Sequence, residues 1–156
     1  MVSTKKFIDR VKQLSKKGID YPIGIKHYGK VGNYLHNILI ENPHNKNESD
    51  MKNLELKTKY IKKQNSIGLA NYSDPDDCFN KTVNKIKKGL ALIDYDIIKN
   101  KIYLKSLTIF SNFSLKDYGL YMNPYHGKKI DHKINIKNLF KVYKKSIIYN
   151  LGKEVK

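Results

Sequence analysis

Two carboxylates and a lysine lie close together in the chain, at Asp50, Glu55 and Lys57. If this segment is a β strand, successive side chains point to opposite faces, so Leu54 and Leu56 share the core face. Glu55 and Lys57 then share the other face, roughly 6–7 Å apart, and Asp50 lies at or just before the start of the strand. Such a group suits phosphodiester cleavage. Hard oxygen ligands hold Mg²⁺, the metal acidifies a bound water, and a lysine stabilises developing negative charge.

The same residues also fit a purely structural interpretation. Glu-Leu-Lys is a common tripeptide, and alternating charge on a solvated strand face is ordinary. A second carboxylate pair, Asp94 and Asp96, lies on one face of a later predicted strand, where no neighbour in the sequence completes a site. The segments on either side of Asp50 therefore decide which interpretation is favoured.

The flanking segments carry a recognisable pattern. Residues 29–42 include Gly32-Asn-Tyr-Leu-His36 and precede Asp50 and Glu55-Leu-Lys57, and the chain continues with Ser-Ile-Gly-Leu at 66–69. This arrangement resembles the PD-(D/E)xK nucleases, and within them the MutH mismatch-repair and MvaI/BcnI restriction endonuclease group. Those enzymes carry Gly-x-x-Leu-Glu on a helix, then Asp, then Glu-Leu-Lys. The resemblance covers about residues 24–75 and, weakly, residues 126–143. The helix glutamate of the family falls on His36 here.

The resemblance implies a Mg²⁺-dependent endonuclease that cuts double-stranded DNA, with Mn²⁺ as a possible substitute and with type II restriction activity. Asp50 and Glu55 would bind the metal with the backbone carbonyl of Leu56. Lys57 would orient and acidify the attacking water or hold the phosphate. His36 would support these ligands or hold a second metal, and the products would carry 5′-phosphate and 3′-hydroxyl ends.

Two other functions stay open. One is a MutH-like nicking repair endonuclease or a junction resolvase. The other is a non-catalytic nucleic-acid-binding protein that kept the fold after losing the helix glutamate. A monomer would cut one strand per binding event, whereas a homodimer could cut both.

Composition favours a polyanionic partner. The chain has 156 residues, which we expect to form one domain over 1–156, and its formal net charge is +17 with a pI near 9.8. AT-rich codon usage, which enriches lysine, is the alternative explanation. Arg10 is the only arginine, so bidentate reading of guanine by arginine is nearly excluded. Base recognition would then come from Lys, Asn, Ser, Thr, His or backbone groups.

Candidate DNA contacts lie in three parts of the chain. They are Lys30 and Asn33 on a predicted helix, Lys59 on the predicted strand 51–60, and Tyr125, His126, Lys128 and Lys129 in a predicted loop. Loops of this basic and aromatic composition often reach into a DNA groove, although an ordinary surface loop has a similar sequence.

The single cysteine, Cys78, excludes an intramolecular disulfide and a cysteine-based zinc site, and a buried inert thiol is expected there. This composition fits a reducing cytoplasm. The first ten residues lack an apolar run of signal-peptide length, and no segment is apolar enough to span a membrane.

Hydrophobic periodicity and turn residues predict an α/β fold with a mixed central sheet flanked by helices and the active site at one sheet edge. We expect helices over residues 3–17, 30–41, 73–88 and 138–145, and strands over 51–60, 66–72, 90–98, 101–110, 131–136 and 147–151. The strands 51–60 and 66–72 are predicted to form a hairpin. Residues 19–28, 42–49 and 112–130 are predicted loops, the last with one helical turn at 114–119 as an alternative.

Overall fold

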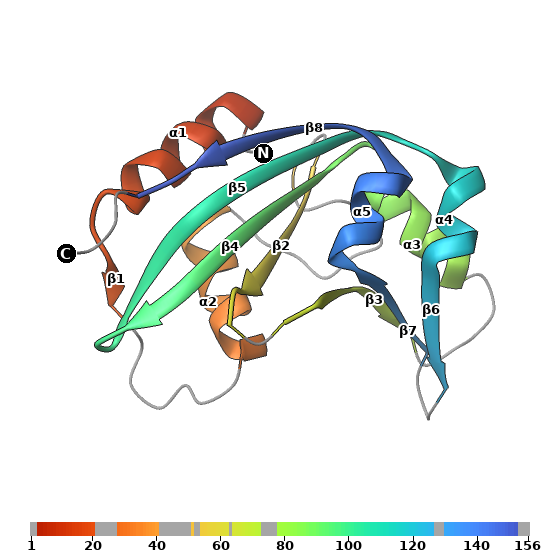
Figure 1. Cartoon of the computed structure of the whole chain (residues 1–156), viewed down its shortest axis with the longest axis horizontal. Helices are drawn as coiled ribbons and strands as arrows, with labels where there is room; N and C mark the ends of the chain where they lie inside the picture. Colours follow the sequence, from red (N-terminus) through yellow and green to blue (C-terminus); the bar gives the residue numbers. More distant parts are fainter. Residues whose placement is uncertain are drawn as a thin grey trace.

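The structure is a computed structural model that describes residues 3–20, 28–40, 51, 54–62, 64–72, 78–126 and 130–152. Two β sheets form its framework (Figure 1). The larger has five strands, and the smaller has three strands and lies beside three short helices at the other end of the molecule.

The five-stranded sheet carries the strand that holds Glu55 and Lys57. Its members are β1 (Ile19–Asp20), β2 (Glu55–Tyr60), β4 (Leu90–Ile98), β5 (Lys101–Phe113) and β8 (Tyr143–Asn150). The order is β1-β5-β4-β2, and β8 pairs with β5 as well. β2 runs parallel to β4, whereas the other pairs are antiparallel. In the described part of the chain β2 therefore forms one edge of this sheet.

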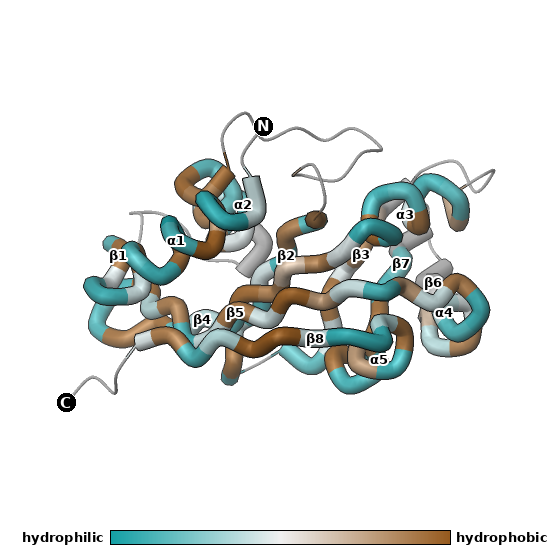
Figure 2. The backbone as a smooth tube through the Cα atoms, turned by 90° about the horizontal axis from the view of Figure 1, so that it is seen from above, coloured by the Kyte–Doolittle hydropathy of each residue, from teal (hydrophilic) through white to brown (hydrophobic). Residues whose placement is uncertain are grey.

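Two helices cover one face of the larger sheet, as Figure 2 shows. They are α1 (Thr4–Ser15) and α2 (Tyr28–Leu39). The Ser3 hydroxyl caps α1 by accepting a hydrogen bond from the amide of Lys6, as the sequence predicts. Apolar residues of both helices pack on the sheet in a first core, among them Phe7, Val11, Val31, Leu35, Leu39, Leu56, Ile93 and Leu107. No helix in the described residues is long and apolar enough to cross a membrane.

The smaller sheet and the remaining helices enclose a second core. Its strands are β3 (Ser66–Tyr72), β7 (Ile130–Asn135) and β6 (Met122–His126), in the order β3-β7-β6. The helices are α3 (Cys78–Ile86), α4 (Leu115–Tyr121) and α5 (Ile136–Val142). Buried members of this core include Ile67, Leu69, Ile86, Tyr118, Ile134, Leu139, Val142 and Tyr143.

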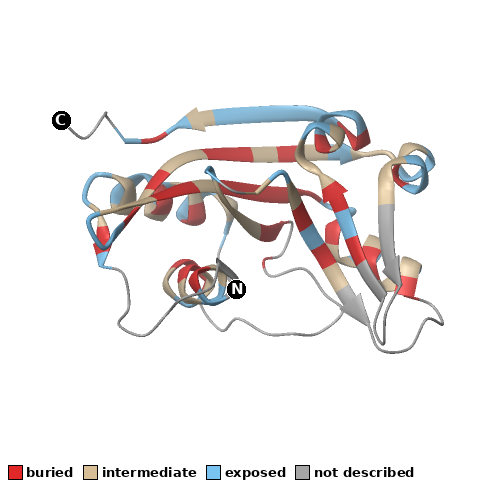
Figure 3. Cartoon of the chain, turned by 60° about the horizontal axis from the view of Figure 1, so that its bottom comes forward, coloured by how far each residue is buried: buried red, intermediate tan, exposed pale blue. Residues whose placement is uncertain are grey.

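Strand β4 joins the two cores because its side chains alternate between them. Ala91, Ile93 and Tyr95 enter the first core, whereas Leu90 and Leu92 enter the second. Figure 3 shows β4 buried along much of its length, β5 with buried positions interspersed among half-buried and exposed ones, and β8 largely exposed beside β5. The strand pattern at 90–98 is thus a nearly continuous apolar run, which is typical of a strand that is covered on both faces.

The predicted fold class is confirmed, but four predictions of local structure differ from the structure. Strands 51–60 and 66–72 do not form a hairpin, because β2 pairs with β4 and β3 pairs with β7 in the other sheet. The predicted loop 112–130 contains α4 and β6, of which only a helical turn near 114–119 was anticipated. The predicted loop 19–28 begins with the short strand β1, and α5 begins and ends earlier than predicted. Segments 42–49 and 73–77 lie outside the described residues.

Candidate functional site

Strand β2 separates its apolar and charged side chains onto opposite faces. Leu54 and Leu56 are buried in the first core. Glu55 and Lys57 lie on the other face, with the Glu55 Oε2 atom 4.0 Å from Lys57 Nζ. The amide of Glu55 donates to the carbonyl of Gly89 at 3.0 Å, which fixes the start of the strand against β4. The predicted alternation over Leu54–Lys57 is confirmed.

Glu55 is buried, and this contradicts the interpretation of the strand face as solvated. Its side chain is 3% exposed, compared with 22% for Lys57. Burial of a carboxylate costs several kcal/mol unless it is paired and hydrogen-bonded, on the order of the penalties seen for buried charges. Burial also raises the pKa of the nearby Tyr143 phenol, and Tyr118 and the charge of Glu55 add to that rise. Glu55 therefore acts electrostatically on the second core.

A row of lysines continues from Lys57 along the same face of β2. Lys59 is 16% exposed and lies 3.9 Å from Asp94 Oδ1 on the parallel neighbour β4. Lys62, in the turn after β2, lies 3.5 Å from Asp96 Oδ1. The second carboxylate pair of the sequence analysis, Asp94 and Asp96, therefore lies close to lysines of β2 and of the turn after it. The sequence analysis did not associate these lysines with the two carboxylates.

Helix α2 packs closely on β2 and carries His36. A Cβ atom placed on Gly32 would lie 3.1 Å from Thr58 Oγ1, so the absence of a side chain permits this approach. His36 lies one helical turn after Gly32, on the same side of α2. It is half-buried, and its carbonyl accepts from the amide of Ile40 at 2.9 Å.

The other predicted site residues are placed as follows. Lys30 and Asn33 are exposed on α2. Tyr125 and His126 belong to the backbone of β6, and their side chains lie outside the description. Asp50, Lys128 and Lys129 lie outside the described residues. Asp50 thus cannot be placed beside Glu55 here, and its role stays a prediction.

The structure describes two of the three groups that are predicted to bind the metal. Glu55 and the carbonyl of Leu56 offer oxygen atoms of the type that Mg²⁺ prefers. Among the described residues, no group of three or more His, Cys, Asp and Glu side chains could hold a metal ion. A complete Mg²⁺ site would therefore need ligands from outside the described residues, for which Asp50 is the predicted one, and Mg²⁺ binding stays a prediction.

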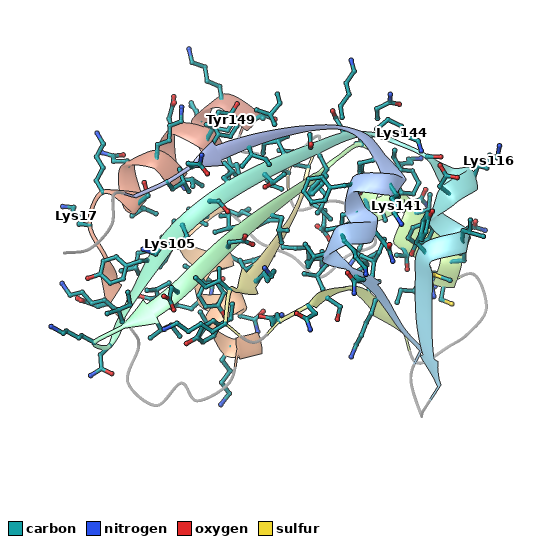
Figure 4. The ribbon with its side chains drawn as sticks, viewed as in Figure 1. Lys17, Lys105, Lys116, Lys141, Lys144 and Tyr149 are labelled. Carbon is teal, nitrogen blue, oxygen red and sulfur yellow. The ribbon has the colours of Figure 1, made fainter. Side chains whose placement is uncertain are left out.

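Lysine is spread over the surface instead of being concentrated at β2. Figure 4 labels Lys17 near β1 and Lys116 at the opposite end on α4. Lys144 donates to Asp117 Oδ2 at 2.6 Å, and its hydrogen bond lowers the pKa of that carboxyl. The only arginine is also engaged, because an Nη atom of Arg10 donates to the carbonyl of Leu39 at 3.3 Å.

Two polar groups were missed by the sequence analysis. Cys78, Thr82 and His132 form a buried cluster, in which Thr82 Oγ1 lies 2.6 Å from His132 Nδ1 and Cys78 Sγ lies 3.6 Å from His132 Nε2. The other group lines a groove between β2 and α5 and includes Gln64 and Asn135. Both depend on contacts between distant segments. Asn135 caps α5 in the structure, but it fell inside the predicted strand 131–136, so its capping role was not anticipated.

Comparison with known proteins places this geometry in a known fold. The chain matches no family model, and no curated protein matches its sequence. Among solved structures, it is similar to the restriction endonuclease MvaI in complex with its cognate DNA substrate. The TM-score is 0.61 at 12% sequence identity, over 95% of this chain and 99% of that chain. The chain has a restriction-endonuclease-like fold. At this identity the likeness establishes the fold alone, so membership of the PD-(D/E)xK nucleases and of any subgroup within them stays a prediction.

Proposed function

We propose that the protein is a metal-dependent endonuclease that hydrolyses phosphodiester bonds in double-stranded DNA, and that it acts as a type II restriction enzyme. The observation that carries this proposal is the buried Glu55 carboxylate, 4.0 Å from Lys57 on an edge strand of a restriction-endonuclease-like fold. An edge strand suits the role because a duplex can approach it from outside the sheet.

Each residue of the site would have a distinct task. Asp50, Glu55 and the Leu56 carbonyl would hold Mg²⁺, with Mn²⁺ as a substitute. The metal would supply charge stabilisation and an acidified water. Lys57, held beside Glu55 and partly exposed, would orient that water or bind a non-bridging phosphate oxygen. Burial of Glu55 beside the second core limits its motion and keeps its carboxylate at the start of β2.

DNA is the partner that the charge and the fold support. The formal net charge of +17 favours a polyanion. We expect backbone and groove contacts from Lys30, Asn33 and Lys59, and from Tyr125, His126, Lys128 and Lys129. The solved structure with the similar fold is described as a complex with cognate DNA. The single free cysteine, Cys78, is compatible with a cytoplasmic enzyme.

His36 supports a second candidate function. It occupies the position of the glutamate in the nucleases that this chain resembles, and loss of a carboxylate there would weaken metal binding. A protein of this kind could retain DNA binding without cleavage. Loss of the helix carboxylate is also compatible with an enzyme that slowly nicks one strand as a monomer.

A supercoiled-plasmid assay with Mg²⁺ separates these functions. Linear product indicates cleavage of both strands, nicked product indicates a nicking enzyme or resolvase, and a gel shift without product indicates binding alone. We expect Asp50→Ala, Glu55→Ala and Lys57→Ala each to reduce cleavage by at least about 10²-fold while DNA binding survives.

Lys17→Ala is the control for the loss of a positive charge away from the site, because Lys17 is an exposed lysine near β1. This variant should cleave like the wild type. Cleavage by Lys57→Ala at the wild-type rate would show that this site assignment is wrong.

A further inference from the structure

A groove lined mainly by polar residues lies on the same side of β2 as the candidate catalytic residues. Its volume is about 560 Å³, and the residues that line it include Lys59, Gln64, Asn65, Asn135, Lys137 and Phe140. These residues come from β2, from the turn before β3 and from the junction of β7 with α5. The amide of Ile136 donates to the carbonyl of Asn65 at 2.9 Å and ties the turn to α5. The groove is therefore built by segments far apart in the chain.

Two side-chain amides in the groove have fixed orientations. Gln64 Oε1 accepts a hydrogen bond from the backbone amide of Tyr60 at 2.9 Å. Asn135 Oδ1 accepts one from the backbone amide of Lys137 at 3.1 Å. Because the partner is an N–H donor in each case, the accepting atom must be the oxygen. The NH₂ group of each side chain then remains as a donor, and neither has an acceptor within the described part of the chain.

The charge of the groove is modest. Lys59 Nζ lies 3.9 Å from Asp94 Oδ1, so Asp94 offsets part of its charge. Lys137 is exposed. The groove thus presents two neutral NH₂ donors, one lysine offset by Asp94 and one exposed lysine, a set of donors that suits a group bearing hydrogen-bond acceptors.

An aromatic side chain completes the groove. Phe140 is 46% exposed, and its ring packs edge-on against Phe110, with centroids 4.9 Å apart and an interplanar angle of 71°. Contact with the buried Phe110 holds the exposed ring in place. A fixed, exposed aromatic surface can contact a thymine methyl or the face of a base.

We propose that this groove reads the edge of a base that presents hydrogen-bond acceptors, such as the N7 and O6 atoms of guanine or O4 of thymine. The inference rests on the proposed function and names the part of the site that gives sequence preference. Arginine, the usual reader of guanine, does not serve this groove, since Arg10 is the only arginine of the chain and is not among the residues that line it.

The spacing of residues along β2 gives an expected distance between the base read by the groove and the cleaved bond. Glu55 and Lys59 are four residues apart along β2, which is roughly 13 Å at the rise of a β strand. Stacked base pairs rise by about 3.4 Å, so 13 Å corresponds to about four base pairs. For a duplex lying along β2, a base read beside Lys59 should then be about four base pairs from the cleaved bond.

Gln64→Glu and Asn135→Asp test the proposal with little change in shape. Each keeps the oxygen that accepts from the backbone amide and replaces the NH₂ donor with an acceptor oxygen. The matched control is Asn138→Asp, which adds the same charge on α5 outside the residues that line the groove. The probe is a library of randomised DNA duplexes, selected by binding without Mg²⁺ and then sequenced. The site of cleavage is taken from plasmid fragment ends.

We expect Gln64→Glu or Asn135→Asp to shift preference at one base pair from guanine or thymine towards cytosine, whose N4 amine is a donor, by about fivefold or more. Asn138→Asp should weaken binding equally for all sequences. Unchanged preference in both groove variants, or the same uniform weakening as in Asn138→Asp, would overturn base reading and indicate a phosphate contact. A wild-type protein that binds duplexes without preference overturns base reading and leaves the proposed nuclease intact. A wild-type protein that binds no duplex overturns both.

Discussion

At the scale of single residues, burial distinguishes Glu55 from an ordinary charged strand residue. Its side chain is 3% exposed, whereas Lys57, two residues further along the same face, is 22% exposed. An isolated buried carboxylate would be destabilising, so its retention here calls for compensation by Lys57 and by its other contacts. A metal bound at the same carboxylate would compensate further.

Alternation alone was enough to predict that Glu55 and Lys57 share a face opposite Leu54 and Leu56. The degree of burial could not be predicted, because it depends on the second core, which is built by β3, β7 and the helices α3–α5. The orientation of the Gln64 and Asn135 amides was also beyond the sequence, since it is set by hydrogen bonds to Tyr60 and Lys137 in the folded chain.

His36 gives a prediction about metal requirement. Two Mg²⁺ ions roughly 3.5–4 Å apart repel each other and need anionic ligands, which histidine does not supply. We therefore expect one tightly held metal at Asp50 and Glu55, with a weak or absent second one. Replacing His36 with glutamate should lower the Mg²⁺ concentration that gives half-maximal cleavage.

The measurement is the initial cleavage rate against Mg²⁺ concentration for the wild type and His36→Glu. His36→Gln serves as the control, because it changes the side chain without adding charge. Identical Mg²⁺ dependence in all three proteins would mean that His36 has no electrostatic part in the site.

At the scale of elements, the incorrect hairpin has a clear physical origin. Consecutive strands usually pair with each other, and a short polar turn at 61–65 made that pairing the default for 51–60 and 66–72. β2 instead runs parallel to β4, and a parallel pair requires a long crossover connection. The segment that contains β3 and α3 supplies the crossover. The sequence contains no local signal for this choice.

Strand β6 was missed because its sequence does not alternate. Met122–His126 includes Pro124, which removes a backbone donor. β6 is the end strand in the order β3-β7-β6, and proline in sheets is largely confined to such positions. Pairing with β7 therefore creates a strand where composition predicted a loop.

The contact of α2 with β2 gives a prediction about stability. Alanine is more favourable than glycine in a helix by about 0.8–1 kcal/mol, but a Cβ on Gly32 would lie 3.1 Å from Thr58 Oγ1. We expect Gly32→Ala to stabilise the protein by about that amount when Thr58 is also alanine. In the wild-type background the gain should be smaller by at least about 0.5 kcal/mol, a typical coupling energy for residues in contact.

The free energy of unfolding in urea, measured for the wild type, both single variants and the double variant, gives this coupling. Additive effects of the two substitutions would show that α2 can move away from β2 without cost.

The cluster between α3 and β7 gives a prediction about pH. Burial lowers the pKa of His132 below its ordinary value of 6.5. The unfolded chain therefore takes up a proton at a higher pH than the folded chain does. The stability contributed by neutral His132 is present above about pH 6.5 and is lost as pH falls towards the folded pKa. Protonation would also make both ring nitrogens donors, so that neither could accept a hydrogen bond from Thr82 or Cys78.

His132→Gln removes the titrating group from this cluster. Between about pH 7.5 and about pH 5.5, the range in which histidine titrates, the wild type should lose more of its free energy of unfolding than the variant. Urea denaturation at several pH values measures both losses. An equal loss in the two proteins would contradict a role for His132.

At the scale of the whole molecule, the sequence predicted the fold class correctly but left the meaning of the high net charge open. The sequence indicated an α/β fold with a mixed sheet, and the structure has that architecture, whereas the active site at a sheet edge stays a prediction. The division into two sheets was not predicted, because β4 supplies residues to both cores and its apolar run contains no boundary between them. The net charge of +17 left a polyanionic partner and codon bias as alternatives, and lysines at both ends of the molecule are compatible with both.

Salt dependence of DNA binding distinguishes these alternatives. Each phosphate neutralised by the protein adds about −0.9 to the slope of log K against log salt. We expect a slope equivalent to at least about five phosphates. Lys30→Gln should make the slope shallower by about 0.9, because Lys30 is exposed on α2, the helix that packs on β2. Lys17→Gln, near β1, should leave it unchanged. A binding constant that hardly varies between low and physiological salt would show that the lysine content reflects codon usage and that phosphate contacts contribute little.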